Sequence, residues 1–159
     1  MGCPGTQSLY EGLLRVYPTV KPRSFEFDIR EVDAARLMFN GWIIETAQSG
    51  HTATSIAYRI EARGKAIMYT GDAKENPALV QIARDADVFV CECAFPRGYP
   101  TDDHMTADAV GRAAHAARAK RVVLNHLYPP ALEVDIAAQV RAEYAGEIII
   151  AVDGTRVSV

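Results

Sequence analysis

Residues Asp87 to Cys93 read DVFVCEC and hold three adjacent apolar residues, Val88, Phe89 and Val90. A continuous apolar run of this length is typical of a β-strand that is buried on both faces, as in a parallel sheet. Arg121 to Asn125 (RVVLN) shows the same pattern. These two segments therefore predict an α/β protein in which helices cover a sheet.

Helical patterns lie between and after these two strands. Asn76 as N-cap and Pro77 at the first helical position predict a short helix that ends near Asp85. An apolar stripe predicts a second helix from Thr106 to about Lys120, and a third is expected from Glu133 to Tyr144. Each helix follows a strand, which favours a layered sheet with helices on its face.

The remaining strands extend the sheet toward both ends of the chain. Thr54 to Glu61 and Lys65 to Thr70 are β-rich runs joined by a short connection that contains Gly64, so they predict a hairpin. Further strands are expected at Phe25–Arg30, Gly41–Thr46, Glu147–Val152 and Arg156–Val159. The predicted fold class is α/β with a mixed sheet.

Composition limits the classes of protein that fit. The chain has 159 residues, of which 49% are hydrophobic and 23% charged, so we expect one domain over residues 1–159. A net charge of −3 provides no overall basic field for nucleic acid or membranes. Since no apolar run reaches the roughly 18 residues that span a bilayer, we expect a cytoplasmic protein without a membrane partner.

Cys91 and Cys93 alternate along the predicted strand, so their side chains share one face and Glu92 points to the other. Free cysteine is among the most buried residue types. With no second cysteine pair nearby, this spacing favours two small core residues over a zinc site.

Three polar residues follow predicted strands directly or after one loop: Asp72, His104 and His126. Ligands and catalytic groups collect at the carboxyl ends of strands in α/β sheets, so we expect these side chains to converge. Asp72 suits either metal ligation or a turn, and His126 suits either metal ligation or a surface position. His104 suits general acid catalysis. His51, before the hairpin, is a candidate substrate-binding residue at the same edge.

Five short motifs and their order resemble the ribonuclease Z branch of the metallo-β-lactamase superfamily. The motifs are Gly50-His51 before Tyr58-Arg59-Ile60, Thr70-Gly71-Asp72, Cys91-Glu92-Cys93-Ala94, His104-Met105-Thr106-Ala107 and Asn125-His126-Leu127-Tyr128-Pro129. The resemblance covers almost the whole chain. It implies half of an αβ/βα sandwich that activates water with two metal ions.

The resemblance also implies a role for individual residues. Asp72 resembles the carboxylate that bridges the two ions, and His126 resembles a histidine ligand of one of them. His104 resembles the histidine that protonates the leaving oxygen, and Glu92 resembles an acid that orients it. Zinc is the implied metal, with manganese or iron as alternatives.

The family's His-x-His-x-Asp-His cluster belongs to the N-terminal half of the fold and does not occur in this sequence. The four histidines, His51, His104, His115 and His126, are scattered. We therefore expect residues 1–159 to form the C-terminal half, with the N-terminal half as partner, in the same parent chain or as a separate polypeptide. Alone, such a half should lack activity and expose an apolar face that favours a homo-oligomer.

Two classes of function remain open from the sequence. One is part of a hydrolase that cleaves a phosphodiester in RNA or a small molecule, or an arylsulfatase-like ester hydrolase of the same superfamily. The other is a non-catalytic α/β module that self-associates. Only the hydrolase requires Asp72, His104 and His126 to lie within a few ångströms of one pocket.

Overall fold

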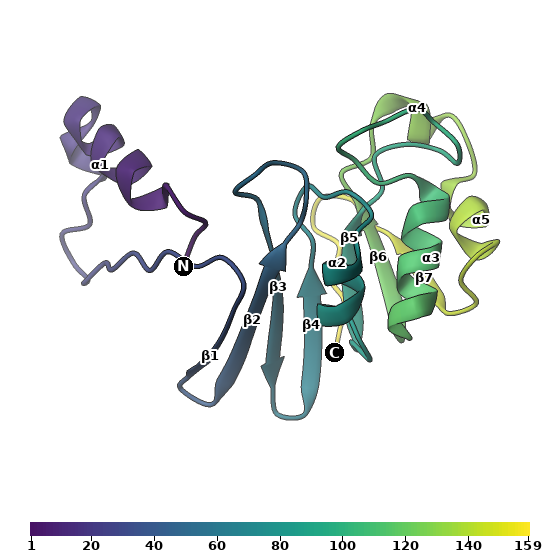
Figure 1. The fold of residues 1–159 in the computed structure, drawn as a ribbon, viewed down its shortest axis with the longest axis horizontal. Helices are drawn as coiled ribbons and strands as arrows, with labels where there is room; N and C mark the ends of the chain where they lie inside the picture. The colour runs from purple at the N-terminus through teal and green to yellow at the C-terminus, as the bar shows by residue number, and fades with distance from the viewer.

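One seven-stranded mixed sheet forms the centre of the computed structural model, which describes all residues from 1 to 159 (Figure 1). The strands lie side by side in chain order. They are β1 Ala35–Phe39, β2 Trp42–Gln48, β3 Ile56–Ala62, β4 Lys65–Tyr69, β5 Val88–Glu92, β6 Arg121–Asn125 and β7 Glu147–Ile150. Strands β1 to β4 pair antiparallel, and β4 to β7 pair parallel. The predicted α/β class with a mixed sheet is confirmed.

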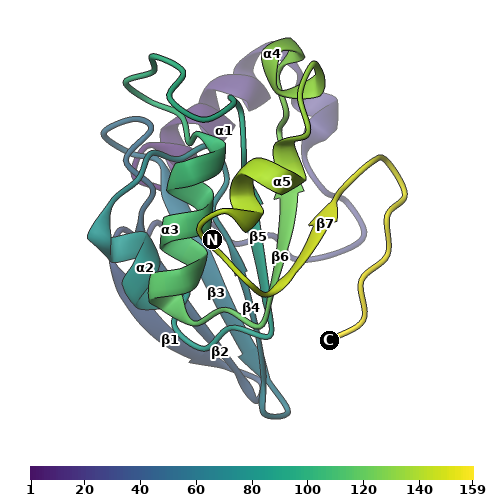
Figure 2. The same ribbon diagram turned by 90° about the vertical axis from the view of Figure 1, so that its right-hand side faces the viewer.

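Helices α2, α3 and α5 cover one face of this sheet (Figure 2). The helices are α1 Thr6–Val16, the 3-10 turn η1 Pro18–Val20, α2 Pro77–Ile82, α3 Ala107–Ala117, α4 Pro129–Leu132 and α5 Ile136–Arg141. The core between helices and sheet includes the fully buried Met68, Phe89 and Leu124. None of the helices combines the length and apolar character that crossing a bilayer requires.

Most predicted elements are present, but several predictions are wrong. Phe25–Arg30 is not a strand, because no strand of the sheet lies beside it, and Phe25 and Phe27 are exposed. Arg156–Val159 also has no ladder partner. The predicted helix 133–144 is shorter, since Asp135 caps α5 by accepting a hydrogen bond from Ala138 N–H. Strand β1 and helix α1 were not predicted.

The sheet face opposite the helices is apolar and is partly open to solvent. Register places Ile44, Ile60 and Ile67 next to one another on this face. Ile67 is 37% exposed and Tyr69, two residues further along β4, is 46% exposed. The last residues of the chain lie on this side of the parallel strands (Figure 2). Val157 lines a hollow there together with Val88 and Val123.

Helix α1 stands apart from the sheet (Figure 1) and buries none of its residues. Its apolar side chains Leu9 and Val16 are 74% and 67% exposed. Together with the open sheet face, this helix leaves a large apolar area in contact with solvent.

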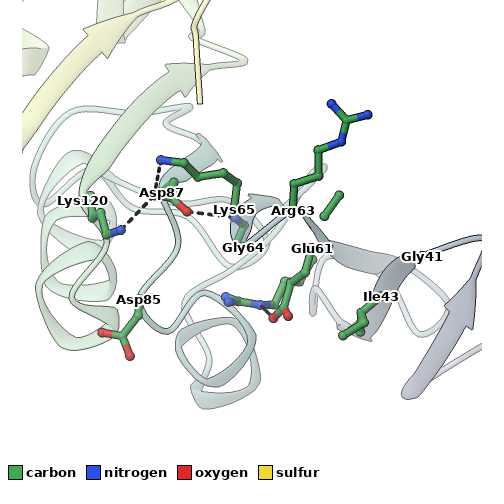
Figure 3. Close-up of a pocket in the computed structure, with 12 residues that line it drawn as sticks. Gly41, Ile43, Glu61, Arg63, Gly64, Lys65, Asp85, Asp87 and Lys120 are labelled. Atoms are coloured by element: carbon green, nitrogen blue, oxygen red, sulfur yellow. Dashed lines mark hydrogen bonds and ion pairs between the residues drawn. The ribbon is translucent and has the colours of Figure 1, made fainter.

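The end of the sheet at which β5 and β6 begin carries an ion-pair cluster around Asp87 (Figure 3). One carboxylate oxygen of Asp87 lies 2.8 Å from Lys120 Nζ and 3.4 Å from Lys65 Nζ. The other oxygen accepts a hydrogen bond from Ala66 N–H at 2.9 Å. The Lys120 ammonium first, and the Ala66 N–H next, lower the pKa of Asp87 to about 2. Asp87 therefore ties the start of β5 to β4 and to the loop before β6.

We predict that Asp87→Asn lowers the free energy of unfolding at pH 7 by about 1.5–3 kcal/mol, the range for hydrogen bonds to charged groups. Because the folded-state pKa is depressed from 3.8 to about 2, the carboxylate stabilises the fold above about pH 4. That contribution disappears as the pH falls to about 2. Urea unfolding should therefore show the unfolding free energy of the wild-type protein falling toward that of the variant as the pH falls from about 4 to about 2.

The exposed Asp28 provides the control for this experiment. Asp28→Asn should leave the unfolding free energy within about 0.5 kcal/mol of wild type. Equal effects of the two substitutions at pH 7 would contradict a stabilising role for Asp87.

Candidate metal-dependent active site

Three parallel strands present polar residues at the same edge of the sheet. Asp72 follows β4, Glu92 ends β5 and His126 follows β6. A fourth residue, His51, belongs to the loop after β2, and the bridge between Gly50 and Ala73 holds this loop beside Asp72. The predicted convergence at the carboxyl ends of the strands is therefore what the fold produces.

Asp72 lies between two histidines. Its Oδ2 is 3.9 Å from His51 Nε2, and its Oδ1 is 3.7 Å from His126 Nε2. The carboxylate is 47% exposed, so ligands from solvent can reach it. Gly71 has a φ of 58°, which allows the sharp turn after β4, and Ser49 Oγ donates a 2.6 Å hydrogen bond to the Asp72 carbonyl oxygen.

Glu92 is fully buried and holds this edge of the sheet together. Its Oε1 accepts a hydrogen bond from the backbone N–H of Ala73. Its Oε2 lies 2.8 Å from His104 Nδ1 and 3.2 Å from His126 Nδ1. One carboxylate oxygen thus serves two imidazole rings, and the buried charge has three hydrogen-bond donors.

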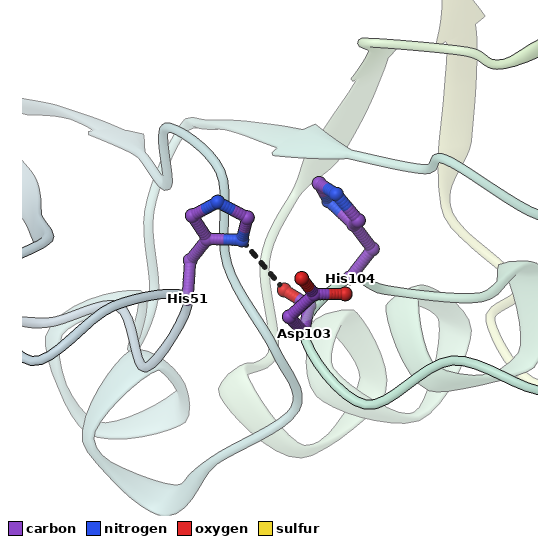
Figure 4. Close-up of side chains that lie close together, drawn as sticks. All are labelled: His51, Asp103 and His104. Atoms are coloured by element: carbon purple, nitrogen blue, oxygen red, sulfur yellow. Dashed lines mark hydrogen bonds between the residues drawn. The ribbon is translucent and has the colours of Figure 1, made fainter.

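These contacts determine which nitrogen of each ring carries a proton. A carboxylate accepts hydrogen bonds and cannot donate them, so His104 and His126 carry their protons on Nδ1. His51 Nδ1 lies 3.0 Å from the carbonyl oxygen of Asp103 and must donate as well (Figure 4). In all three rings, Nε2 remains for a metal ion or a substrate.

His126 takes an uncommon backbone conformation to reach its position. Its φ is 53°, in the left-handed region where non-glycine residues cost of order 1–3 kcal/mol. The residue lies between the end of β6 and Pro129, which begins α4. The surrounding contacts, above all that with Glu92, compensate this cost and direct the ring toward Asp72.

His104 occupies the centre of the histidine group. Its ring centroid is 4.7 Å from that of His51 and 5.4 Å from that of His126. Only 10% of its side chain is exposed. The backbone N–H of His104 donates a 3.3 Å hydrogen bond to Thr101 Oγ1. Through Glu92, His104 is linked to His126, whose Nε2 lies 3.7 Å from Asp72 Oδ1.

This edge holds two groups of potential metal ligands, and within each group the ligand atoms lie within 4.8 Å of one another. One group is Glu92, His104 and His126, and the other is His51, Asp103 and His104. In the first group, both histidine Nδ1 atoms already donate to Glu92. The free Nε2 atoms of His51 and His126 on either side of Asp72 are therefore the better donor set. The sequence placed His51 at this edge but gave no local sign that it pairs with Asp72, and it did not single out Asp103.

The two strand cysteines take no part in the site. Cys91 and Cys93 are fully buried in the core beneath the helices. Burial, and then the neighbouring Glu92 carboxylate, raise the pKa of Cys93 to about 12. Both thiols therefore stay protonated, as the sequence interpretation of small core residues requires. His115, predicted to be solvated, is exposed on α3.

The sheet is covered by helices on one face, and the histidines and carboxylates at its carboxyl edge are residue types that bind metal ions. The family model described as beta-lactamase superfamily domain matches residues 4–127. The chain therefore belongs to the beta-lactamase superfamily.

Relatives and solved structures agree with this assignment. The chain is 30% identical over 132 residues to the uncharacterized protein ML1173 of Mycobacterium leprae, covering 80% of this chain and 46% of that protein. It is 37% identical over 99 residues to ribonuclease Z of Myxococcus xanthus, covering 57% of this chain and 32% of that enzyme. The chain thus spans between about a third and a half of these relatives.

The crystal structure of the metallo-β-lactamase fold protein YhfI from Bacillus subtilis superposes with a TM-score of 0.75 at 22% identity. The match covers 89% of this chain and 60% of YhfI. The predicted resemblance to the metallo-β-lactamase superfamily, with ribonuclease Z among the relatives, is confirmed.

We predict that Glu92→Gln changes the tautomers of His104 and His126. The amide keeps one acceptor oxygen and places an N–H₂ group where the other was, so the oxygen satisfies either Ala73 N–H or the two rings. Turned toward Ala73, it leaves both Nδ1–H groups facing a donor. Long-range ¹H–¹⁵N NMR spectra should show Nδ1–H for both rings in the wild type and a shift toward Nε2–H in the variant. Leaving a buried donor without a partner should also cost about 1–3 kcal/mol of stability.

The exposed His115 is the internal control, and its NMR signals should stay unchanged. Nε2–H signals from both His104 and His126 in the wild-type spectrum would contradict the proposed arrangement.

Proposed function

We propose that this chain supplies part of the metal centre of a hydrolase that cleaves phosphodiesters. One observation carries the proposal. The two carboxylate oxygens of Asp72 face the Nε2 atoms of two different histidines, His51 and His126, and His104 lies beside them on the buried Glu92. A structural ion pair would need only one of these histidines.

The donor set fits the metal that the family implies. Imidazole nitrogen and carboxylate oxygen are ligands that zinc takes, and manganese and iron take them as well. Asp72 would be shared between two ions, with His51 on one side and His126 on the other. Since a catalytic zinc usually takes about three protein ligands, further donors must come from outside this chain.

Bound metal ions would supply an activated water and would polarise the phosphoryl oxygens. The residues of this chain would handle the leaving group. His104 Nε2 would give its proton to the leaving oxygen as the phosphorus–oxygen bond breaks. Glu92 would hold the ring through Nδ1 and stabilise its doubly protonated form beforehand. His104 would then recover a proton from solvent.

The choice of a phosphodiester follows from the similarity to ribonuclease Z of Myxococcus xanthus. RNA and small phosphodiesters are the substrates we propose. Hydrolysis of a sulfate ester, as in an arylsulfatase-like enzyme, is the alternative within the same superfamily.

The missing metal ligands would come with a second β-layer. The open sheet face exposes Tyr69 and Ile67, and α1 exposes a further apolar side. In addition, Asn125 Oδ1, at the edge of this face, is buried without a hydrogen-bond partner. We propose that the N-terminal half of the same fold covers the face, as part of a longer chain or as a separate polypeptide.

The same open face favours one other function. A second copy of this chain could cover the apolar sheet, which would make the protein a self-associating module without catalysis. This alternative requires no metal.

We predict that the chain mixed with the N-terminal half of the fold gains zinc and hydrolyses bis(p-nitrophenyl) phosphate, whereas the chain alone stays largely metal-free and inactive. Asp72→Ala should lose most of the bound zinc and at least 100-fold of the activity, because both ions lose a ligand. Metal analysis after gel filtration and release of p-nitrophenol measure the two effects.

His115→Ala, a histidine far from Asp72 in the sequence and exposed on α3, is the matched control and should keep both zinc and activity. Cleavage of p-nitrophenyl sulfate instead of the phosphodiester would favour the arylsulfatase-like alternative. A metal-free dimer that stays inert in the mixture would contradict the hydrolase and support the self-associating module.

A further inference from the structure

A hollow of about 330 Å³ lies directly beside His104. Its walls come from the loop after β4, the loop that precedes His104, and the first turn of α3. His104 lines the hollow, whereas Asp72, His51 and His126 do not. His104 is therefore the residue that this hollow shares with the candidate site.

Tyr99 gives the hollow an aromatic wall. Its ring stacks on Phe95 with centroids 4.3 Å apart and an angle of 3° between the planes. Phe95 is itself held edge-on against Tyr128 at 5.1 Å. Tyr99 lines the hollow and Phe95 does not, and the stacked Phe95 covers only one of the two faces of the Tyr99 ring. The ring is 38% exposed and supported from behind, as in a stacking platform.

Two charged side chains of the hollow have no ion-pair partner. Glu75 is neutralised by Arg112, with oxygen–nitrogen distances of 3.0 and 2.7 Å, but Lys74 and Asp102 make no salt bridge. The stem of Lys74 packs over Gly50, where an added Cβ would lie 3.0 Å from Lys74 Cγ. Lys74 is thus anchored next to the loop of His51, on the side of the metal ligands.

We propose that this hollow binds the leaving group of the substrate, and that the leaving group is a nucleoside. The inference rests on the proposed function, in which His104 protonates the leaving oxygen, because that oxygen must then lie next to the hollow. The base would stack on Tyr99, and Asp102 would accept hydrogen bonds from ribose hydroxyl or base amino groups. Lys74 would face the phosphate between the two sites.

Binding of free adenosine tests this subsite without metal or catalysis. Saturation-transfer NMR should detect adenosine on the wild-type chain at millimolar concentration, with transfer strongest to the base protons. Tyr99→Ala should weaken binding by about tenfold or more, the effect of removing one stacking partner. Tyr99→Phe should keep the affinity within about twofold, because the stacking face remains. Ribose alone should bind more weakly than adenosine.

Tyr17→Ala, a substitution of a tyrosine that is 59% exposed and outside the hollow, is the matched control and should leave binding unchanged. Absence of adenosine binding, or equal binding by wild type and Tyr99→Ala, would overturn the subsite. The proposed function is tested separately. If the chain binds adenosine through Tyr99 but never takes up metal, the subsite is supported and the hydrolase is contradicted.

Discussion

The buried carboxylate of Glu92 is the interaction on which the candidate site depends. It ends β5 and joins the loop after β4, through Ala73 N–H, to His104 and His126. A fully buried charge is costly unless hydrogen bonds compensate it, so the three donors must stay in place for the fold to tolerate Glu92. The hydrogen bonds that satisfy this charge also fix the rings of His104 and His126, and His126 Nε2 lies 3.7 Å from Asp72 Oδ1.

This arrangement works because β4, β5 and β6 run parallel. Their carboxyl ends meet at one edge, and each strand is followed by a residue with chemistry to contribute. At the opposite end, Asp87 ties the start of β5 to β4 and to Lys120, so that both ends of the central strands are fixed. The site is therefore built on rigid elements rather than on loops alone.

The sequence alone predicted those strands and helices that local residue patterns determine. The apolar runs of β5 and β6 predict buried strands, and Asn76-Pro77 predicts the start of α2, whose N-cap contacts are present. Phe25–Arg30 alternates like a strand, but a strand also needs a neighbour, which the sequence does not reveal. The contact of His51 with Asp72 was equally hidden, because it depends on the bridge between Gly50 and Ala73 more than 20 residues apart.

The central claim is that His51 and His126 together with Asp72 receive metal ions at the edge of the sheet. Titration of Mn²⁺ into the ¹⁵N-histidine-labelled protein, assembled with the N-terminal half of the fold, tests it most directly, because the ion broadens NMR signals of nearby nuclei. We expect the imidazole signals of His51 and His126 to broaden first, with that of His104 next and that of His115 unchanged. Broadening of His115 alone, or equal broadening of all four histidines, would contradict a metal centre at Asp72.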